Sequence, residues 1–126
     1  MSEGIQNSIS EESFYRKKFL LSLIIPGTFV FLMWLTRITE SLFELDLVSL
    51  GIYPLTLKGL PGILLSPFIH EDFRHLLNNS LPFLLLSVAL FYFYSEIALR
   101  IFSLTYVLTG SLVWLGGREA WHIGAS

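Results

Sequence analysis

The sequence predicts an all-α, polytopic transmembrane helix bundle with three spans and the start of a fourth. Of its 126 residues, 53% are hydrophobic, 15% are aromatic and only 14% are charged, and the mean hydropathy is +0.65. This composition is far too apolar for an ordinary soluble domain, so the lipid bilayer is the expected surroundings. Three long apolar stretches, separated by polar or mixed segments, are the expected spans.

The first expected span covers residues 19–35, which carry no charge. As a helix this stretch reaches about 25 Å, close to a bilayer core of about 30 Å. Pro26 lies in its middle and predicts a kink. Residues 1–18 form a polar tail that we expect to be disordered. Because the tail ends in the basic run RKK, and positive charge marks the inner side of a span, we expect the N-terminus to be cytoplasmic.

The second and third spans are expected at residues 75–94 and 97–115. The third contains Arg100, whose side chain must reach the membrane interface. The outer loop between the first two spans, residues 36–74, holds too many apolar residues for a solvated linker, so we expect it to fold back on or into the membrane surface. A polar turn follows the third span, and the chain stops where a fourth helix would begin.

Charge and cysteine content narrow the classes of function. The formal net charge is −2 and the basic residues form no arm or stripe, so nucleic acid is not an expected partner. The chain has no cysteine, which excludes a disulfide framework, a thiolate nucleophile and sulfur-ligated zinc. Any catalysis must use oxygen or nitrogen groups, and no cofactor is implied.

The segment SPFIHEDFRHLLNNS places histidine and asparagine at the mouth of the second span. His75 and Asn79 are four residues apart and therefore share one helix face, while Asn78 points about 100° away. Two hydrogen-bond donors aimed at one point could hold an oxyanion. On spacing alone, polar contacts between packed helices are the favoured explanation of the pair. A metal site at His70 and His75 lacks a familiar ligand pattern and is not expected.

The final residues Gly-Ala-Ser are the second candidate feature. Small residues let a backbone approach a peptide bond closely, and a serine at a helix start has a free amide that could stabilise an oxyanion. By itself, such a tripeptide is more often a frayed end of the chain.

Together, the H-x4-H-x3-N pattern at the second span and the later G-x-S resemble the rhomboid family of intramembrane serine proteases. The segment GIYPLTLKGLPGILLSPFIHEDFRHLLNN also looks like the family's first loop leading into that pattern. The resemblance covers roughly residues 51–126, and the combination of motifs is more specific than either one alone. It implies that residues 19–126 are part of a rhomboid-like transmembrane domain.

The resemblance implies a role for four side chains. Ser126 matches the nucleophile, His75 and Asn79 match the groups that stabilise the oxyanion, and His70 matches an upstream histidine that orders the same cavity. The family's general base is a histidine from a later span, which is absent from this chain. His122 is not taken as the base, because Gly124 argues against a rigid helix joining it to the serine.

Three functions follow as hypotheses. The first is a serine endopeptidase that cleaves transmembrane protein substrates near the outer face, with this chain a truncated product, a split gene or one piece of a cut chain. Such a fragment is expected to be inactive without the remaining C-terminal half. The second is a non-catalytic rhomboid-like protein that binds transmembrane segments. The third, a small helical scaffold unrelated to the family, predicts that His75 and Asn79 can become leucine without loss of function.

Overall fold

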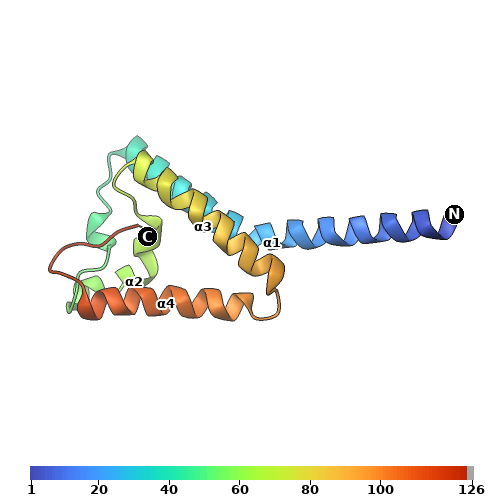
Figure 1. Ribbon diagram of the computed structural model, residues 1–126. Coiled ribbons are helices and arrows are strands. Elements are labelled where there is room, and N and C mark those ends of the chain that lie inside the picture. The colour runs from blue at the N-terminus through green and yellow to red at the C-terminus, as the bar shows by residue number, and fades with distance from the viewer. Residues whose placement is uncertain (125–126) are drawn as a thin grey trace.

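The computed structural model describes residues 1–124 as an all-helical chain (Figure 1). Its three long helices are α1 (Ser2–Phe43), α3 (Phe73–Phe93) and α4 (Ala98–Gly116), and all three are long and apolar enough to cross a membrane. The predicted fold class is therefore confirmed. Four short helices lie between α1 and α3, namely η1 (Val48–Leu50), η2 (Leu57–Gly59), α2 (Gly62–Leu65) and η3 (Ser66–Phe68).

Helix α1 is much longer than the predicted first span. The expectation of a disordered tail over residues 1–18 is wrong, because the helix begins at Ser2, and it also continues eight residues past Leu35 to Phe43. Its 42 residues correspond to about 63 Å, roughly twice the thickness of a bilayer core. Neither flank contains a proline, so nothing stops the helix until Glu44 adopts a left-handed conformation with φ of 51°.

The helix α1 also changes direction along its length (Figure 1). Its blue N-terminal part projects away from the bundle, and its lighter blue and cyan part runs alongside α3. Pro26 is the only proline in α1 and its side chain is fully buried. A proline removes one helical hydrogen bond and clashes with the preceding turn, which accounts for the bend.

Helices α1 and α3 pack side by side (Figure 1). Met33 of α1 and Leu76 of α3 are completely buried. The Asp72 side chain caps α3 by accepting a hydrogen bond of 2.6 Å from the backbone amide of His75. This cap fixes where α3 begins, within three residues of the predicted start.

Helices α3 and α4 are joined by a short turn and then diverge (Figure 1). An aromatic cluster centred on Phe29 of α1 joins the middle of α3 to the second turn of α4. The Phe29 ring lies 4.7 Å from that of Phe83 on α3 and 5.8 Å from that of Phe102 on α4, measured between ring centroids. The folded loop and residues 117–124 lie in the opening between the diverging ends.

The segment from Glu44 to Asp72 is a folded loop attached to α4. The prediction of a loop starting at residue 36 is wrong, because residues 36–43 continue α1. The indole nitrogen of Trp114 donates to the Thr56 carbonyl at 3.0 Å, and the Leu55 amide donates to the Trp114 carbonyl at 3.0 Å. These bonds supply partners for loop backbone groups that would otherwise need water.

Residues 117–124 after α4 are extended rather than helical. His122 pairs with Ile52 of the loop in an antiparallel bridge, with N to O distances of 2.8 and 2.9 Å. Gly51 permits this approach, since a methyl group added there would lie 2.7 Å from the His122 carbonyl oxygen. The predicted start of a fourth span is therefore not seen up to Gly124, and Ser126 lies outside the described residues.

The loop is packed tightly enough for one added methyl group to disturb it. In Gly62→Ala, the new methyl would overlap the backbone of Gly51, and overpacking of this kind costs about 1–3 kcal/mol. We expect a lower unfolding temperature, measured in detergent as thermal loss of the monodisperse size-exclusion peak. Gly27→Ala is the matched control, because nothing lies within 4 Å of its methyl. Equal stability of the two variants would contradict the packing described for the loop.

Candidate functional site

The first turns of α3 present two different faces to the protein. Leu76 and Ser80 are buried, and Ser80 is hydrogen-bonded to Trp34 of α1. His75 and Asn79 occupy the neighbouring face, about 100° around the helix. His75 is half-buried and Asn79 is only 8% exposed. Because the α1 interface takes up the first face, the second is left to face the extended segment.

Gly124 lies directly against this second face. A methyl group added at Gly124 would lie 3.1 Å from His75 Cε1, 3.2 Å from His75 Nε2 and 3.3 Å from Asn79 Nδ2. The Gly124 amide donates to the Ser66 carbonyl at 2.9 Å, and its φ of 96° is a conformation that favours glycine. The fold therefore brings the glycine of the predicted G-x-S together with His75 and Asn79. Ser126 itself lies outside the described residues.

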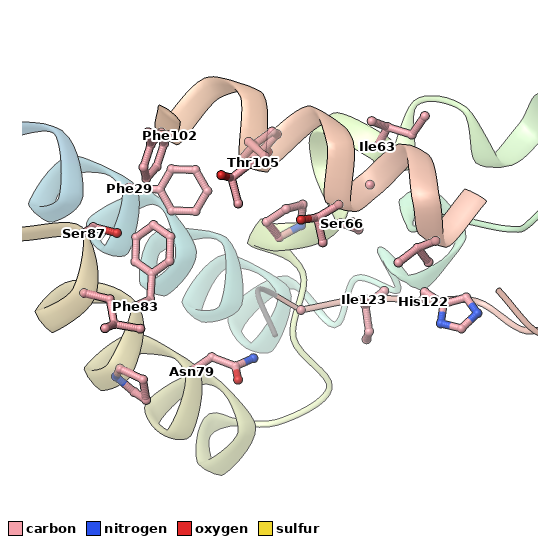
Figure 2. Close-up of a pocket in the computed structure, with 18 of the residues that line it drawn as sticks. Phe29, Ile63, Ser66, Asn79, Phe83, Ser87, Phe102, Thr105, His122 and Ile123 are labelled. Carbon is pink, nitrogen blue, oxygen red and sulfur yellow. The ribbon is translucent and has the colours of Figure 1, made fainter. Parts of the chain in front are cut away.

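A cavity of about 480 Å³ adjoins this meeting point, between α3, α4, the loop and the extended segment. Figure 2 shows Phe29, Phe83 and Phe102 gathered at one end, and Asn79, His122 and Ile123 toward the other. The cavity thus has an aromatic end, where the hydroxyls of Ser87 and Thr105 also lie, and another end where Asn79 lies near Gly124. This combination of an apolar chamber and a few converging polar groups is typical of binding sites.

The Asn79 carboxamide is a buried donor without an acceptor. Its Nδ2 atom has no hydrogen-bond partner among residues 1–124. Leaving a buried donor unpaired costs about 1–3 kcal/mol, so native proteins rarely do so without a reason. A donor kept in this state is suited to donate a hydrogen bond to a carbonyl oxygen or an oxyanion.

His70 is more deeply buried than its sequence neighbours Glu71 and Asp72 suggest. It is 1% exposed, its ring centroid lies 5.2 Å from that of His75 in an edge-to-face arrangement, and neither ring nitrogen has a partner within residues 1–124. Burial first, and then the nearby charge of His75, lower the pKa of His70 from 6.5 to about 4. His70 is therefore neutral at pH 7 and packs behind His75.

His122 lies in the extended segment and lines the cavity, but its ring points elsewhere. Its Nε2 lies 3.1 Å from the carbonyl oxygen of Arg118, and its backbone pairs with Ile52. These contacts fit the predicted role of a loop histidine. Among the described residues, no group of three or more histidine, aspartate or glutamate side chains could hold a metal ion.

Two parts of this arrangement were not predicted from the sequence. The Ser66 carbonyl and the Ile52 backbone hold the extended segment in place, and both contacts use main-chain atoms that leave no side-chain signature. Trp34 was also missed, because an isolated tryptophan in an apolar span is indistinguishable from a residue that faces lipid. The sequence signal available for Trp34 was the polar Ser80 within the second span, which needs a partner there.

The fold and this polar site define an all-α protein with three helices able to span a membrane and with a half-buried histidine and a buried asparagine on one face at the start of α3. Over 99 residues the chain is 31% identical to uncharacterized protein Rv1337 of Mycobacterium tuberculosis and to uncharacterized protein Mb1372 of Mycobacterium bovis. Each match covers 77% of this chain and 38% of the relative. Uncharacterized protein ML1171 of Mycobacterium leprae is 32% identical over 98 residues, covering 77% of this chain and 36% of that protein.

The chain therefore spans less than two fifths of the length of these curated relatives. No protein-family model matches the sequence, and no solved structure matches it.

The burial of His70 predicts a pH dependence of stability. Because its pKa is about 4 in the folded protein and 6.5 in a free side chain, the unfolded chain binds a proton here more readily. This contribution to stability is present above pH 6.5 and is lost as the pH falls toward 4, and the loss reaches about 2 kcal/mol near pH 5. Unfolding temperatures measured from pH 7.5 to 4.5 should fall less steeply in His70→Phe. Identical slopes would contradict the buried neutral His70.

Proposed function

We propose that this chain forms part of a rhomboid-type intramembrane serine protease, in which His75 and Asn79 stabilise the oxyanion and Ser126 is the nucleophile. The observation that carries the proposal is the contact of Gly124 with His75 and Asn79. His75 and Asn79 precede Gly124 by nearly fifty residues in the sequence, yet their side chains lie against its backbone. Gly124 in turn lies two residues before Ser126 in the sequence. Motifs that resemble one family at separate points of the sequence thus converge on one place.

The chemistry follows from the groups that meet there. The Ser126 hydroxyl oxygen would bond to the carbonyl carbon of a peptide, and the carbonyl oxygen would take up negative charge. Asn79 Nδ2, the His75 ring and the Ser126 amide are the donors proposed to stabilise that charge. The peptide C–N bond then breaks, the amine leaves with a proton, and water releases the acyl group from the serine. Donors held in place before the reaction are worth about 10²–10³ in rate each.

The general base is proposed to come from a chain segment other than residues 1–126. The His122 ring is directed at the Arg118 carbonyl, which argues against His122 in this role. A histidine supplied from elsewhere would take the proton from Ser126 and pass it to the leaving amine. We therefore propose that the remaining C-terminal half of a longer protein completes the site, and that residues 1–126 alone do not hydrolyse peptides.

The proposed topology places the N-terminus in the cytoplasm and the site near the outer face. The basic run before the apolar part of α1 supports this orientation. Three crossings then bring the start of α3 and the end of α4 to the same, outer side. Substrates are proposed to be transmembrane proteins, whose helices unwind where they approach the membrane surface. No cofactor is required by this mechanism.

A second candidate function is binding of transmembrane segments without catalysis. The aromatic end of the cavity favours it, because Phe29, Phe83 and Phe102 offer an apolar surface that needs no reaction chemistry. The two functions differ in their demand on Ser126. A binding protein would tolerate its replacement, whereas a protease would not.

A fluorophosphonate probe, which bonds to activated serines, tests the protease. The longest chain that the gene encodes should be labelled in detergent, and Ser126→Ala should abolish labelling. Asn79→Ala should slow labelling about 10²-fold, the typical cost of a lost oxyanion donor. Asn7→Ala is the matched control, since Asn7 is exposed near the start of α1 and does not line the cavity, and its rate should stay within about threefold.

Residues 1–126 alone should remain unlabelled. Absence of labelling in a well-folded sample of the longest chain would refute the protease and leave the binding function, which predicts co-purification with transmembrane segments in Ser126→Ala as in the unaltered protein.

A further inference from the structure

One hydrogen bond crosses the α1–α3 interface beside the candidate site. The indole Nε1 of Trp34 donates to the Ser80 hydroxyl oxygen at 3.0 Å, and that hydroxyl donates to the Leu76 carbonyl at 2.7 Å. Ser80 is 6% exposed, so water does not compete for either bond. The serine hydroxyl is thus fully engaged, once as acceptor from another helix and once as donor within its own.

The position of Ser80 on α3 is what gives this bond its importance. Ser80 directly follows Asn79, so the two side chains leave the helix about 100° apart. If Ser80 is fixed against α1, Asn79 and His75 must face the side where Gly124 lies. A rotation of α3 about its own axis would break the bond to Trp34 and carry Asn79 away from Gly124 in the same movement.

We propose that Trp34 is a positioning residue, whose hydrogen bond to Ser80 sets the rotation of α3 and so holds Asn79 and His75 against the segment that leads to Ser126. Trp34 touches no reacting group in this proposal. Its effect on chemistry rests on the proposed protease function, whereas its effect on the orientation of Asn79 does not.

A single hydrogen bond can have this influence because of the surroundings. Apolar helix faces pack against one another or against lipid with little preference, so hydrophobic burial does not select one rotation of a membrane helix. A polar bond between helices does select one, because its loss leaves an indole N–H unpaired in an apolar environment. The other side of α3 is populated by leucines such as Leu77 and Leu81 that are more than half exposed, and these would pack against lipid in several rotations.

Neighbouring aromatic contacts keep the indole in place. The ring of Phe73, at the first residue of α3, lies 6.3 Å from that of Trp34, and the Arg37 guanidinium lies 5.2 Å from the Phe73 centroid. Arg37 in turn lies 3.6 Å from Glu40, one turn further along α1. Phe73 of α3 thus lies between Trp34 and Arg37 of α1, and these contacts restrict the movement of the indole that bonds to Ser80.

The test of orientation uses nuclear magnetic resonance and needs no enzymatic activity. The chain has three asparagines, so samples labelled with ¹⁵N-asparagine give three side-chain amide signals, which single substitutions assign. Trp34→Phe, which keeps the ring and removes the donor, and Ser80→Ala should both move the Asn79 signal. The double variant should give the same signal as either single one, and Ser80→Thr, which keeps the hydroxyl, should leave it near its original position.

Ser22→Ala is the matched control. Ser22 is another buried serine, its hydroxyl donates to the Phe19 carbonyl within α1 at 2.7 Å, and it does not line the cavity. It should leave the Asn79 signal in place. Unmoved Asn79 signals in both Trp34→Phe and Ser80→Ala, with both variants folded, would overturn the proposal, as would an equal movement in Ser22→Ala.

The catalytic consequence is measured separately on the longest chain that the gene encodes. Trp34→Phe and Ser80→Ala should each slow fluorophosphonate labelling about tenfold, as expected for misplaced oxyanion donors, without an additive effect in the double variant. Ser80→Thr should restore the rate. If the unaltered protein is not labelled, the proposed protease function fails while the asparagine signals still decide the role of Trp34. If labelling is normal in Trp34→Phe, the positioning role fails and the protease stands.

Discussion

The geometry of the candidate site depends on the backbone pairing between Ile52 and His122. This bridge joins the middle of the folded loop to the extended segment after α4, and it is the reason that the segment turns back toward α3 instead of leaving the bundle. Gly51 allows the two backbones to approach, and the Ser66 carbonyl holds Gly124 at the next contact point. Main-chain atoms that would be costly to leave unpaired near an apolar phase thus determine where the segment goes.

The helices that the sequence predicted best are those whose ends have a local cause. Helix α3 begins at an aspartate cap and α4 ends at Gly116, next to an extended glycine, so the charge-free stretches and the helices nearly coincide. Helix α1 was predicted poorly because a charge-free stretch measures the thickness of an apolar layer and not the length of a helix. Residues 36–43 are polar in part yet contain no glycine or proline, and the helix simply continues through them.

The candidate site was predictable only where its residues are close in sequence. The spacing of His75 and Asn79 placed them on one helix face, which the structure bears out. Their contact with Gly124 could not be predicted from the residue types. It depends on backbone hydrogen bonds between Ile52 and His122, which are seventy residues apart in the sequence. The resemblance to a family supplied that link as an expectation. The deep burial of His70 was likewise unpredictable from the sequence, because Glu71 and Asp72 beside it are exposed.

The packing of α1 against α3 explains why unpaired polar groups can persist at this end of the molecule. Unpaired donors such as Asn79 Nδ2 reduce stability, and a helix free to rotate would turn such a donor toward any available acceptor. The rigid interface with α1, where Met33 and Leu76 are completely buried and Trp34 bonds to Ser80, removes that freedom. The free energy gained at the α1–α3 interface therefore offsets the cost of keeping Asn79 unpaired. An oxyanion site needs this arrangement, because donors that relax onto other acceptors before the reaction cannot stabilise charge that develops during it.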